Sequence, residues 1–463
     1  MNSFGRTAAA VVIAAGLFGY IYLVESRKEP EKSNAESSDV SHEKVFPGLD
    51  KLKVRSVTLK KRGGETVHVE KNAEGWALVS PQEGPADAGE IGTLLDALQS
   101  LETEEIVTES AADMAPFGLA EPKVAVSVVA EGAAKPFEFE LGDAVPAGSG
   151  LFARIPGRPR LFTVSSTLEN TLGKSAFDLR ERALVNVKKD AIQSVEATDK
   201  GRRAFKLVHG AKGEDDWRIE APISTRAARW TVESFLGLVE NLRMESIATE
   251  AATPQDLAKY GLGPTARRLD LGLAESKSLT LEIGGKNSEG KYYAREASSK
   301  LVATINSGLV DDLDKGLANL RATRLLDVAA YEVSGFDVIF GGATRAFTKA
   351  TTKGKDGVDL IEWKAAAPFK SATQEKASDA LFAVGGLDAA AFIDDPKALS
   401  TYGLDAPALR VVLRFDGGKK EDWFEVAVKG DEAFARRRDD GSVLKLDKAK
   451  TEALIKSFTT LGD

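Results

Sequence analysis

The chain has 463 residues, a net charge of −8 and an apolar content of 43%, which together are typical of a mostly soluble protein of about three domains. The excess of acidic over basic residues argues against nucleic acid as the main partner, because phosphate binding needs a basic face. The chain has no Cys and only three widely spaced His. This excludes disulfides, thiolate metal sites and cysteine nucleophiles, and leaves little material for a histidine centre.

The first predicted element is an apolar segment at residues 7–24 (TAAAVVIAAGLFGYIYLV), which carries no charge. As a helix it would be about 27 Å long, close to the thickness of a bilayer core. Tyr20 and Tyr22 lie near its far end, where aromatic belts occur. A cleaved signal peptide is the alternative, but its apolar core is usually about 7–15 residues long. We therefore predict that residues 1–24 form a single-pass membrane anchor.

Residues 25–46 are predicted to be a disordered tether, because their mixed charge, Ser and Pro30 leave too little apolar surface to fold. The basic residues on the two sides of the anchor do not favour an inside N terminus by themselves. A single N-terminal anchor with a large C-terminal body is nevertheless commonly exported. We expect a protein of the cytoplasmic membrane, with its body exported to the extracytoplasmic space.

The rest of the chain contains one unit repeated three times. A Gly-Leu turn recurs at intervals of 143 and 142 residues, each time after a Trp and before an aromatic-Ala-Arg triplet. Three markers in one order indicate triplication, and we assign repeat 1 to residues 47–187, repeat 2 to 188–330 and repeat 3 to 331–463. The markers are Trp76, Trp217 and Trp363; Gly118, Gly261 and Gly403; Pro122, Pro264 and Pro407; and Arg154, Arg295 and Arg436.

Each repeat is predicted to contain an amphipathic helix. Apolar residues from Ile91 to Leu101 follow the spacing i, i+3, i+4, i+7 and i+10, and those from Val232 to Leu242 repeat it. Ser371 and Gln374 carry a capping-box signal for the third helix, as Asp87 and Glu90 do for the first. In repeat 3 a Gly385-Gly386 pair replaces the stripe. We therefore expect the third helix to be short or broken.

The segments around each helix have the alternating pattern of antiparallel strands. In repeat 1 the segments 54–60 and 66–70 flank a Gly-Gly turn and predict a hairpin. The predicted fold class is α+β, with three tandem repeats of about 140 residues, each combining antiparallel strands with an amphipathic helix. Further strands are expected at residues 123–129, 137–141, 151–155 and 161–164.

The repeated residues have structural and functional interpretations. A core anchor is favoured for the Trp over a platform that stacks a ligand, and the Gly of the turn needs only a positive φ. For Arg154, Arg295 and Arg436 two interpretations stay open. Each could pair with a carboxylate inside its own repeat, or the three could form a periodic contact to an acidic or phosphorylated envelope component. The three Arg are therefore the candidate interaction residues.

No catalytic, cofactor-binding or metal-binding pattern stands out. The sequence lacks a G-x-S-x-G or H-E-x-x-H motif of catalytic type. Residues 261–266 fit a loose dinucleotide fingerprint, but the other repeats do not keep it. We expect no cofactor and no enzyme activity, and a carboxylate-based hydrolase is the least favoured function.

The combined pattern resembles the bacterial domain-of-unknown-function family 4340, in three tandem copies. The resemblance implies a membrane-anchored envelope protein, since members are often encoded beside ABC-2-type and gliding-type transporter components. It implies no catalytic residues. The matching residues are Trp76, Pro81, Asp87, Phe117-Gly118-Leu119, Pro122, Leu141-Gly142, Phe152-Ala153-Arg154 and Phe177-Asp178-Leu179-Arg180, then Leu281-Glu282-Ile283-Gly284, Tyr292-Tyr293-Ala294-Arg295, Tyr402-Gly403-Leu404-Asp405 and Pro407.

From the anchor, the tether, the repeats and this resemblance we expect a non-enzymatic accessory or scaffold subunit of a cell-envelope transport or motility complex. Its partners would be the lipid bilayer, through residues 7–24, and other envelope proteins such as ABC-2-type transporter subunits. The alternative is a module that binds envelope glycan or lipid through the repeated Trp and Arg.

Overall fold

The computed structural model describes residues 42–146, 148–210, 217–327, 329–353 and 359–462. The predicted anchor at residues 7–24 and the tether up to residue 41 lie outside these residues. Within the described part, no helix is both long and apolar enough to cross a bilayer. The chain divides into two compact units, with the boundary between Glu181 and Arg182 in the sequence. We call residues 42–181 module 1, residues 182–322 module 2 and residues 323–462 module 3.

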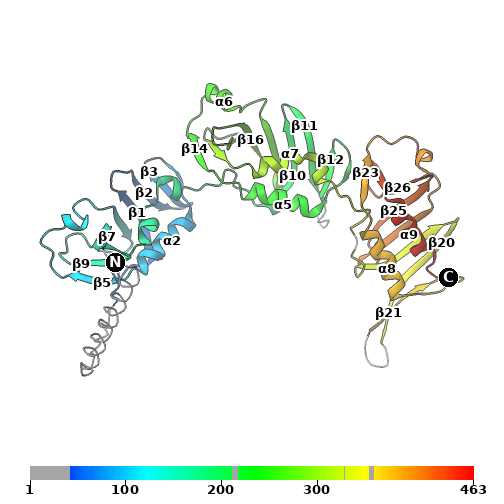
Figure 1. The fold of residues 1–463 in the computed structure, drawn as a ribbon, viewed down its shortest axis with the longest axis horizontal. Coiled ribbons are helices and arrows are strands. Elements are labelled where there is room, and N and C mark those ends of the chain that lie inside the picture. Colours follow the sequence, from blue (N-terminus) through cyan, green and yellow to red (C-terminus); the bar gives the residue numbers. More distant parts are fainter. Residues whose placement is uncertain (1–41, 147, 211–216, 328, 354–358, 463) are drawn as a thin grey trace, which may run out of the picture. The chain divides into compact units, whose positions relative to one another are not determined.

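Module 1 combines a sheet with a 12-residue helix and two shorter ones (Figure 1, blue to cyan). Its elements are η1 (Lys51–Lys53), β1 (Val54–Lys61), β2 (Thr66–Asn72), β3 (Gly75–Ser80), β4 (Gly84–Pro85), α2 (Ala88–Gln99), β5 (Glu105–Thr108), η2 (Ala115–Phe117), β6 (Val124–Ala130), β7 (Phe137–Ala144), β8 (Gly150–Arg154), β9 (Leu161–Ser165), α3 (Leu168–Leu172) and α4 (Ala176–Leu179).

Modules 2 and 3 contain the same succession of strands. Module 2 has η3 (Lys189–Ala191), β10 (Ile192–Asp199), β11 (Arg202–His209), β12 (Trp217–Ala221), β13 (Thr225–Arg226), α5 (Arg229–Glu240), β14 (Ser246–Thr249), α6 (Pro254–Tyr260), β15 (Arg267–Leu273), η4 (Ala274–Ser276), β16 (Ser278–Lys286), β17 (Tyr292–Glu296), β18 (Val302–Ile305) and α7 (Gly308–Leu320). Module 3 has β19 (Val333–Phe340), β20 (Ala343–Lys353), β21 (Asp359–Ala365), β22 (Ala372–Thr373), α8 (Gln374–Gly385), β23 (Ala389–Ile393), η5 (Leu399–Tyr402), β24 (Leu409–Phe415), η6 (Asp416–Gly418), β25 (Lys420–Lys429), β26 (Glu432–Arg437), β27 (Val443–Leu446) and α9 (Lys448–Thr459).

Each module is built on one nine-stranded antiparallel sheet. The strand order in module 1 is β4-β3-β2-β1-β6-β7-β8-β9-β5, and the corresponding strands of modules 2 and 3 follow the same order. The strands predicted at 54–60, 66–70, 123–129, 137–141, 151–155 and 161–164 are confirmed as β1, β2, β6, β7, β8 and β9. The predicted α+β class with repeated units is therefore confirmed.

The first helix of each module packs the predicted apolar stripe into the core. In α2 the stripe consists of Ile91, Leu94, Leu95 and Leu98, and α5 repeats it from Val232 to Val239. The side chain of Asp87 caps α2 by accepting from the amides of Gly89 and Glu90. These residues are buried because the stripe lies against one face of the sheet.

The expectation of a short or broken third helix is wrong. Helix α8 has 12 residues, as α2 and α5 do, and Gly385 is merely its last residue, where Gly interrupts no further turn. Its cap is Thr373, not Ser371, and the Thr373 side chain accepts from the amide of Lys376. The apolar stripe therefore starts earlier than expected, and small residues begin it: Ala377, Ala380, Leu381 and Val384 are buried.

Larger aromatic residues in module 3 compensate for these small helix residues. Phe336 lies at the centre of an aromatic group, with ring centroids 5.0 Å from Phe347, 4.9 Å from Trp363 and 6.0 Å from Phe458. All four side chains are fully buried. A core tolerates such exchanges when the total volume is kept. The stripe is hard to recognise in the sequence because its own residues are small. The large side chains that pack against them come from other elements of the module.

A short segment in front of each sheet pairs with the segment behind the first helix. The amide of Val45 donates to the carbonyl of Leu101 at 2.9 Å, that of Leu184 to Leu242 at 3.0 Å and that of Leu325 to Leu387 at 2.8 Å. Residues 43–46, assigned to the end of the tether from sequence, are thus paired with module 1, and Val45 and Phe46 are buried in its core.

The Gly-Leu turn has the predicted left-handed conformation in all three modules. Gly118, Gly261 and Gly403 have φ of 69°, 71° and 73° and end η2, α6 and η5. In modules 1 and 2 a neighbouring strand approaches the turn closely. A Cβ added at Gly284 would lie 2.1 Å from the carbonyl oxygen of Tyr260. The turn and this strand are therefore fitted to each other without room for a methyl group.

We expect Gly284→Ala to destabilise module 2 by about 1–3 kcal/mol, because the added methyl group forces the turn away from β16. Hydrogen exchange of the β16 amides measures the loss as a lower opening free energy. Gly237→Ala in α5 is the control, since a Cβ there meets nothing within 4 Å. Unchanged exchange in the Gly284 variant would contradict the close fit.

Candidate functional site

The three repeated Arg lie at one register position of the sheets. Arg154 is the cross-strand partner of Glu140, Arg295 of Glu282 and Arg436 of Glu425. The Nε atoms of Arg154 and Arg295 lie 2.5 Å and 2.8 Å from the carboxylates of their partners. The structure thus shows the intramolecular pairing that was one of the two interpretations. Contact of these Arg with an envelope component stays a prediction.

The pair in module 3 is looser than the other two. Arg436 Nη1 lies 3.8 Å from Glu425, which instead accepts from Arg410 at 2.7 Å. In module 2, by contrast, the side chains of Glu282 and Arg295 are only 5% and 14% exposed. Removing Arg295 therefore leaves a carboxylate in the sheet without its charge partner.

We expect Arg295→Ala to cost about 3 kcal/mol of module 2 stability and Arg436→Ala less than about 1 kcal/mol of module 3 stability. The reason is that Glu425 keeps its ion pair with Arg410, whereas Arg268, the residue opposite Glu282 in β15, pairs with Asp270 and leaves Glu282 without a cation. Hydrogen exchange of the amides in β16 and β25 measures the two losses separately. Equal losses would show that the cross-strand pair is not what holds Arg295 in place.

The repeated Trp side chains pack against the cores of their modules. Trp217 and Trp363 are buried, and Trp76 is half-buried against the core of module 1. The indole of Trp363 donates to Gln374 Oε1 at 2.8 Å, which links its strand to the start of α8. Each Trp strand is followed by a cis peptide bond, before Pro81, Pro222 and Pro368. This placement matches the interpretation of the Trp as core anchors.

Module 3 receives two Arg of module 2 on one face of its sheet. Arg226 makes a bidentate pair with Asp422, with N–O distances of 2.7 Å and 2.6 Å, and donates to the carbonyl of Arg438. Arg321 pairs with Asp394 at 2.7 Å and lies over the ring of Phe392, 3.6 Å from its centroid. We call this surface of module 3 the acceptor face.

The acceptor face is held by a buried ion pair of its own. Arg437 and Asp440 lie 2.8 Å apart with both side chains 0% exposed. Asp440 also accepts from Thr225 of module 2 at 2.9 Å, and the amide of Gly441 donates to the carbonyl of Ser224 at 2.9 Å. Charge, side-chain and backbone groups therefore all take part in recognising the neighbouring polypeptide.

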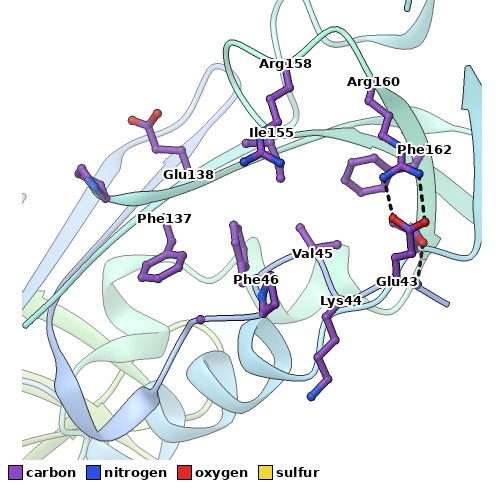
Figure 2. Close-up of a pocket in the computed structure, with 14 residues that line it drawn as sticks. Glu43, Lys44, Val45, Phe46, Phe137, Glu138, Ile155, Arg158, Arg160 and Phe162 are labelled. Atoms are coloured by element: carbon purple, nitrogen blue, oxygen red, sulfur yellow. Dashed lines mark hydrogen bonds and ion pairs between the residues drawn. The ribbon is translucent and has the colours of Figure 1, made fainter. Parts of the chain in front are cut away.

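Module 1 has a cavity of about 390 Å³ between residues 43–48 and the strands β7, β8 and β9 (Figure 2). Apolar and polar groups line it to a similar extent, and five of the lining residues are charged: Glu43, Lys44, Glu138, Arg158 and Arg160. Figure 2 shows Phe46 and Phe137 on one side of the cavity and Ile155 on the other. Phe46 packs edge-on against Phe137, with centroids 5.6 Å apart. The size is in the range of small-ligand and side-chain pockets.

One end of this cavity is closed by an ion-pair cluster. Arg160 donates to both carboxylate oxygens of Glu43, at 2.7 Å and 3.3 Å, and its Nε lies 3.2 Å from Glu109 (Figure 2 for the first pair). The hydrogen bond from Arg160, and then its charge, lower the pKa of Glu43. The same hydrogen bond raises the pKa of Arg160. The cluster fastens the entering segment to the start of β9.

We expect Glu43→Gln to loosen this segment at neutral pH. Because the folded pKa of Glu43 lies below its ordinary value of 4.5, the ion pair stabilises the docked segment above that pH and is lost as the pH falls through the lowered pKa. A dye on Lys44→Cys, the only thiol in a chain without Cys, reports the loosening as a fall in anisotropy.

Acidification should therefore lower the anisotropy in the Glu43 chain and leave the Glu43→Gln chain nearly unchanged. Glu138→Gln is the control, because Glu138 is an exposed neighbour at the same cavity and has no ion pair within the described part of the chain. If both chains followed the same pH profile, the Glu43–Arg160 pair would not fasten the segment.

A second cavity, of about 210 Å³, lies beside the Gly-Leu turn of module 2. Its charged residues neutralise one another, since Arg267 lies 2.7 Å from Asp314 and 3.8 Å from Asp199. Across the described ranges, no group of three or more His, Cys, Asp or Glu is placed to hold a metal ion. The cavity of module 1 is thus the better candidate site.

Sequence reasoning missed the residues of this cavity because they do not repeat. Arg160 precedes β9, whereas Leu301 and Ser442 precede the corresponding strands β18 and β27. Triplication is recognised from residues that recur in all three copies, and the cavity residues are not among these. The signal that could have identified the cavity is the opposite one, a departure of one repeat from the other two at matching positions.

Comparisons with known proteins give a family but no close structure. The model of a family described as "Domain of unknown function (DUF4340)" matches residues 76–216 and 217–407. The curated proteins contain no match. Among solved structures, the DNA polymerase III subunit beta from Pseudomonas aeruginosa is 8% identical, over 87% of this chain and 96% of that chain. Its TM-score of 0.12 carries no argument about fold or function.

The two family matches each begin at a repeated Trp and not at the start of a sheet. The segment 76–216 runs from the third strand of module 1 past β11 of module 2 and ends at the residue before β12. The sequence unit is therefore offset from the folded module. The boundary between two sequence repeats can be placed at any point of the period. Only a boundary between two modules keeps all nine strands of one sheet in the same unit.

Proposed function

Since the chain belongs to the DUF4340 family, we propose that it is a non-enzymatic, membrane-anchored accessory or scaffold subunit of a cell-envelope transport or motility complex. In this proposal residues 7–24 hold the chain in the cytoplasmic membrane. The three modules lie in the extracytoplasmic space and bind partner proteins there, among them subunits of an ABC-2-type transporter.

The observation that carries the proposal is the acceptor face of module 3. This face recognises another stretch of polypeptide with a bidentate Arg–carboxylate pair, a stacked guanidinium and backbone hydrogen bonds. Bidentate pairs of this kind give geometric specificity as well as energy. The module fold is therefore able to bind protein at a defined surface, and the chain contains three such modules.

Because the modules have separate cores, several of them can bind subunits of one partner complex at the same time. Modules 1 and 3 each have an apolar core that includes the stripe of their first helix and the inward side of their sheet. A chain of folded repeats presents more binding surface than one domain of the same stability. Binding several subunits at once is the property that a scaffold needs.

Binding of envelope glycan or lipid through the repeated Trp and Arg has less support. Two of the three Trp are buried, which leaves no stacking surface on them. Arg154 and Arg295 have their guanidinium groups paired with Glu in the sheet. An anionic glycan or lipid would have to displace these carboxylates.

Purification from native membranes tests the proposal. A full-length chain with a C-terminal affinity tag is expected to retain a membrane complex that includes transporter subunits, identified by mass spectrometry. The matched control carries the same tag on residues 1–41 joined to an unrelated soluble domain, which separates binding by the modules from binding by the N-terminal segment. Recovery of the full-length chain without any membrane-complex partner would refute the proposed function.

A further inference from the structure

The strand registers identify the surface of module 1 that corresponds to the acceptor face. In β7, Phe137 pairs with Val128, the partner of Val57. In module 3, Asp422 stands at the same place, because it pairs with Leu413, which is the partner of Phe336. The cavity of module 1 therefore occupies the position at which module 3 binds Arg226.

The groups that bind Arg in module 3 have changed in module 1. Phe137 stands in place of Asp422, and Ile155 follows β8 where Arg437 ends β26. The carboxylate of Glu109 corresponds to Asp394, but it is already paired with Arg160, at 3.2 Å. In module 1 the guanidinium at this position belongs to its own Arg160, whereas in module 3 it belongs to Arg321 of module 2.

The result is a face suited to an apolar group. The aromatic side chains of Phe46, Phe137 and Phe162 line the cavity, together with Ile155. Arg158 also lines it and is exposed, and its guanidinium has no ion pair or hydrogen bond among the residues described. Lys44 and Glu138 line the cavity without an ion pair as well, so the unpaired charges there are two cations and one carboxylate among the described residues. An apolar group with a neighbouring carboxylate would satisfy both features.

The end of module 3 lacks the two Arg that module 2 inserts into the acceptor face. In module 2 the donating residue Arg321 follows Leu320, whose carbonyl accepts from the cap residue of α5. At the matching position behind Leu461, module 3 has Gly462, and Lys370-Ser371 precedes β22 in place of the Thr225-Arg226 strand. Module 3 of a second copy therefore cannot repeat the Arg-mediated contact that module 2 makes with module 3.

We propose that the cavity of module 1 binds an extended acidic segment of a partner protein. An aromatic or Leu-sized side chain of that segment enters between Phe46, Phe137 and Ile155, and a carboxylate beside it pairs with Arg158. The partner class rests on the proposed function, since it assumes that the modules bind protein. The site is the acceptor face already used for polypeptide in module 3, with its specificity changed from basic to apolar and acidic.

Peptide binding to the full-length chain in phosphatidylcholine nanodiscs tests this inference. The probe peptide is acetyl-Gly-Ser-Phe-Asp-Glu-Ser-amide. The reporter is an environment-sensitive dye on Pro136→Cys, at the cavity rim. Titration of the peptide is expected to give a saturable shift of the dye emission. The matched control places the dye on Glu421→Cys, the residue before Asp422 on the occupied face of module 3, which should not respond.

Two variants separate the apolar pocket from the charge. Phe137→Asp, which copies Asp422, should abolish the response. Because Phe137 also packs on the core, the decisive variant is the exposed Arg158→Glu. It should weaken binding of the acidic peptide roughly three- to tenfold and favour a peptide with Lys-Lys in place of Asp-Glu. Lys376→Glu on α8 makes the same change of net charge and should leave binding unaltered.

Equal binding of both peptides by wild type and Arg158→Glu would overturn the inference. So would a dye shift produced by phosphatidylglycerol nanodiscs alone without a response to peptide, which would assign the cavity to lipid. The membrane purification distinguishes this failure from failure of the proposed function. A complex that co-purifies equally with wild type, Phe137→Asp and Arg158→Glu overturns the site and leaves the scaffold function standing.

Discussion

The packing of one helical stripe against one face of a nine-stranded sheet is the contact on which each module depends. In module 1 the stripe from Ile91 to Leu98 lies in the same core as Val57 and Phe139 from the middle of the sheet. The whole α2 stripe is buried to within a few per cent, and burial at about 25 cal/mol per Å² makes this the dominant stabilising term. The sheet order can recur three times because this packing recurs, even where Ala377 and Phe336 divide the volume differently in module 3.

The second constraint is where the chain enters and leaves a module. The entering segment pairs with the residues behind the first helix, as Val45 does with Leu101, so it runs along the core before the first strand begins. This brings the entry point next to the start of β9 and next to the start of β7, where the cavity lies. Arg321 lies where the chain leaves module 2, and its side chain contacts the equivalent surface of module 3. The acceptor face follows from this path of the backbone.

Most of the fold could be predicted from the sequence because it depends on periodic signals. Alternation identified β1 and β2, and the period of the Gly-Leu turn identified the three copies. The third helix was misjudged, since Ala377 and Ala380 are weakly apolar and the aromatic residues that complete their packing are distant in sequence. The candidate site was not predictable by the same means. Glu43 to Phe46 have the composition of a tether, and only their pairing with residues 101–103 and 160 gives them a role.

Differences between the copies are therefore the informative part of this repeat protein. The core as a whole must keep its volume, and module 3 does so although single residues of its helical stripe are smaller. A position on the acceptor face is constrained only by what binds there. Asp422 and Phe137 share one register position but meet different demands, because module 3 must neutralise Arg226, whereas module 1 provides Arg160 itself. The matched position therefore gives module 1 an apolar wall where module 3 has a carboxylate, so the two modules offer different chemistry at the same place in one fold.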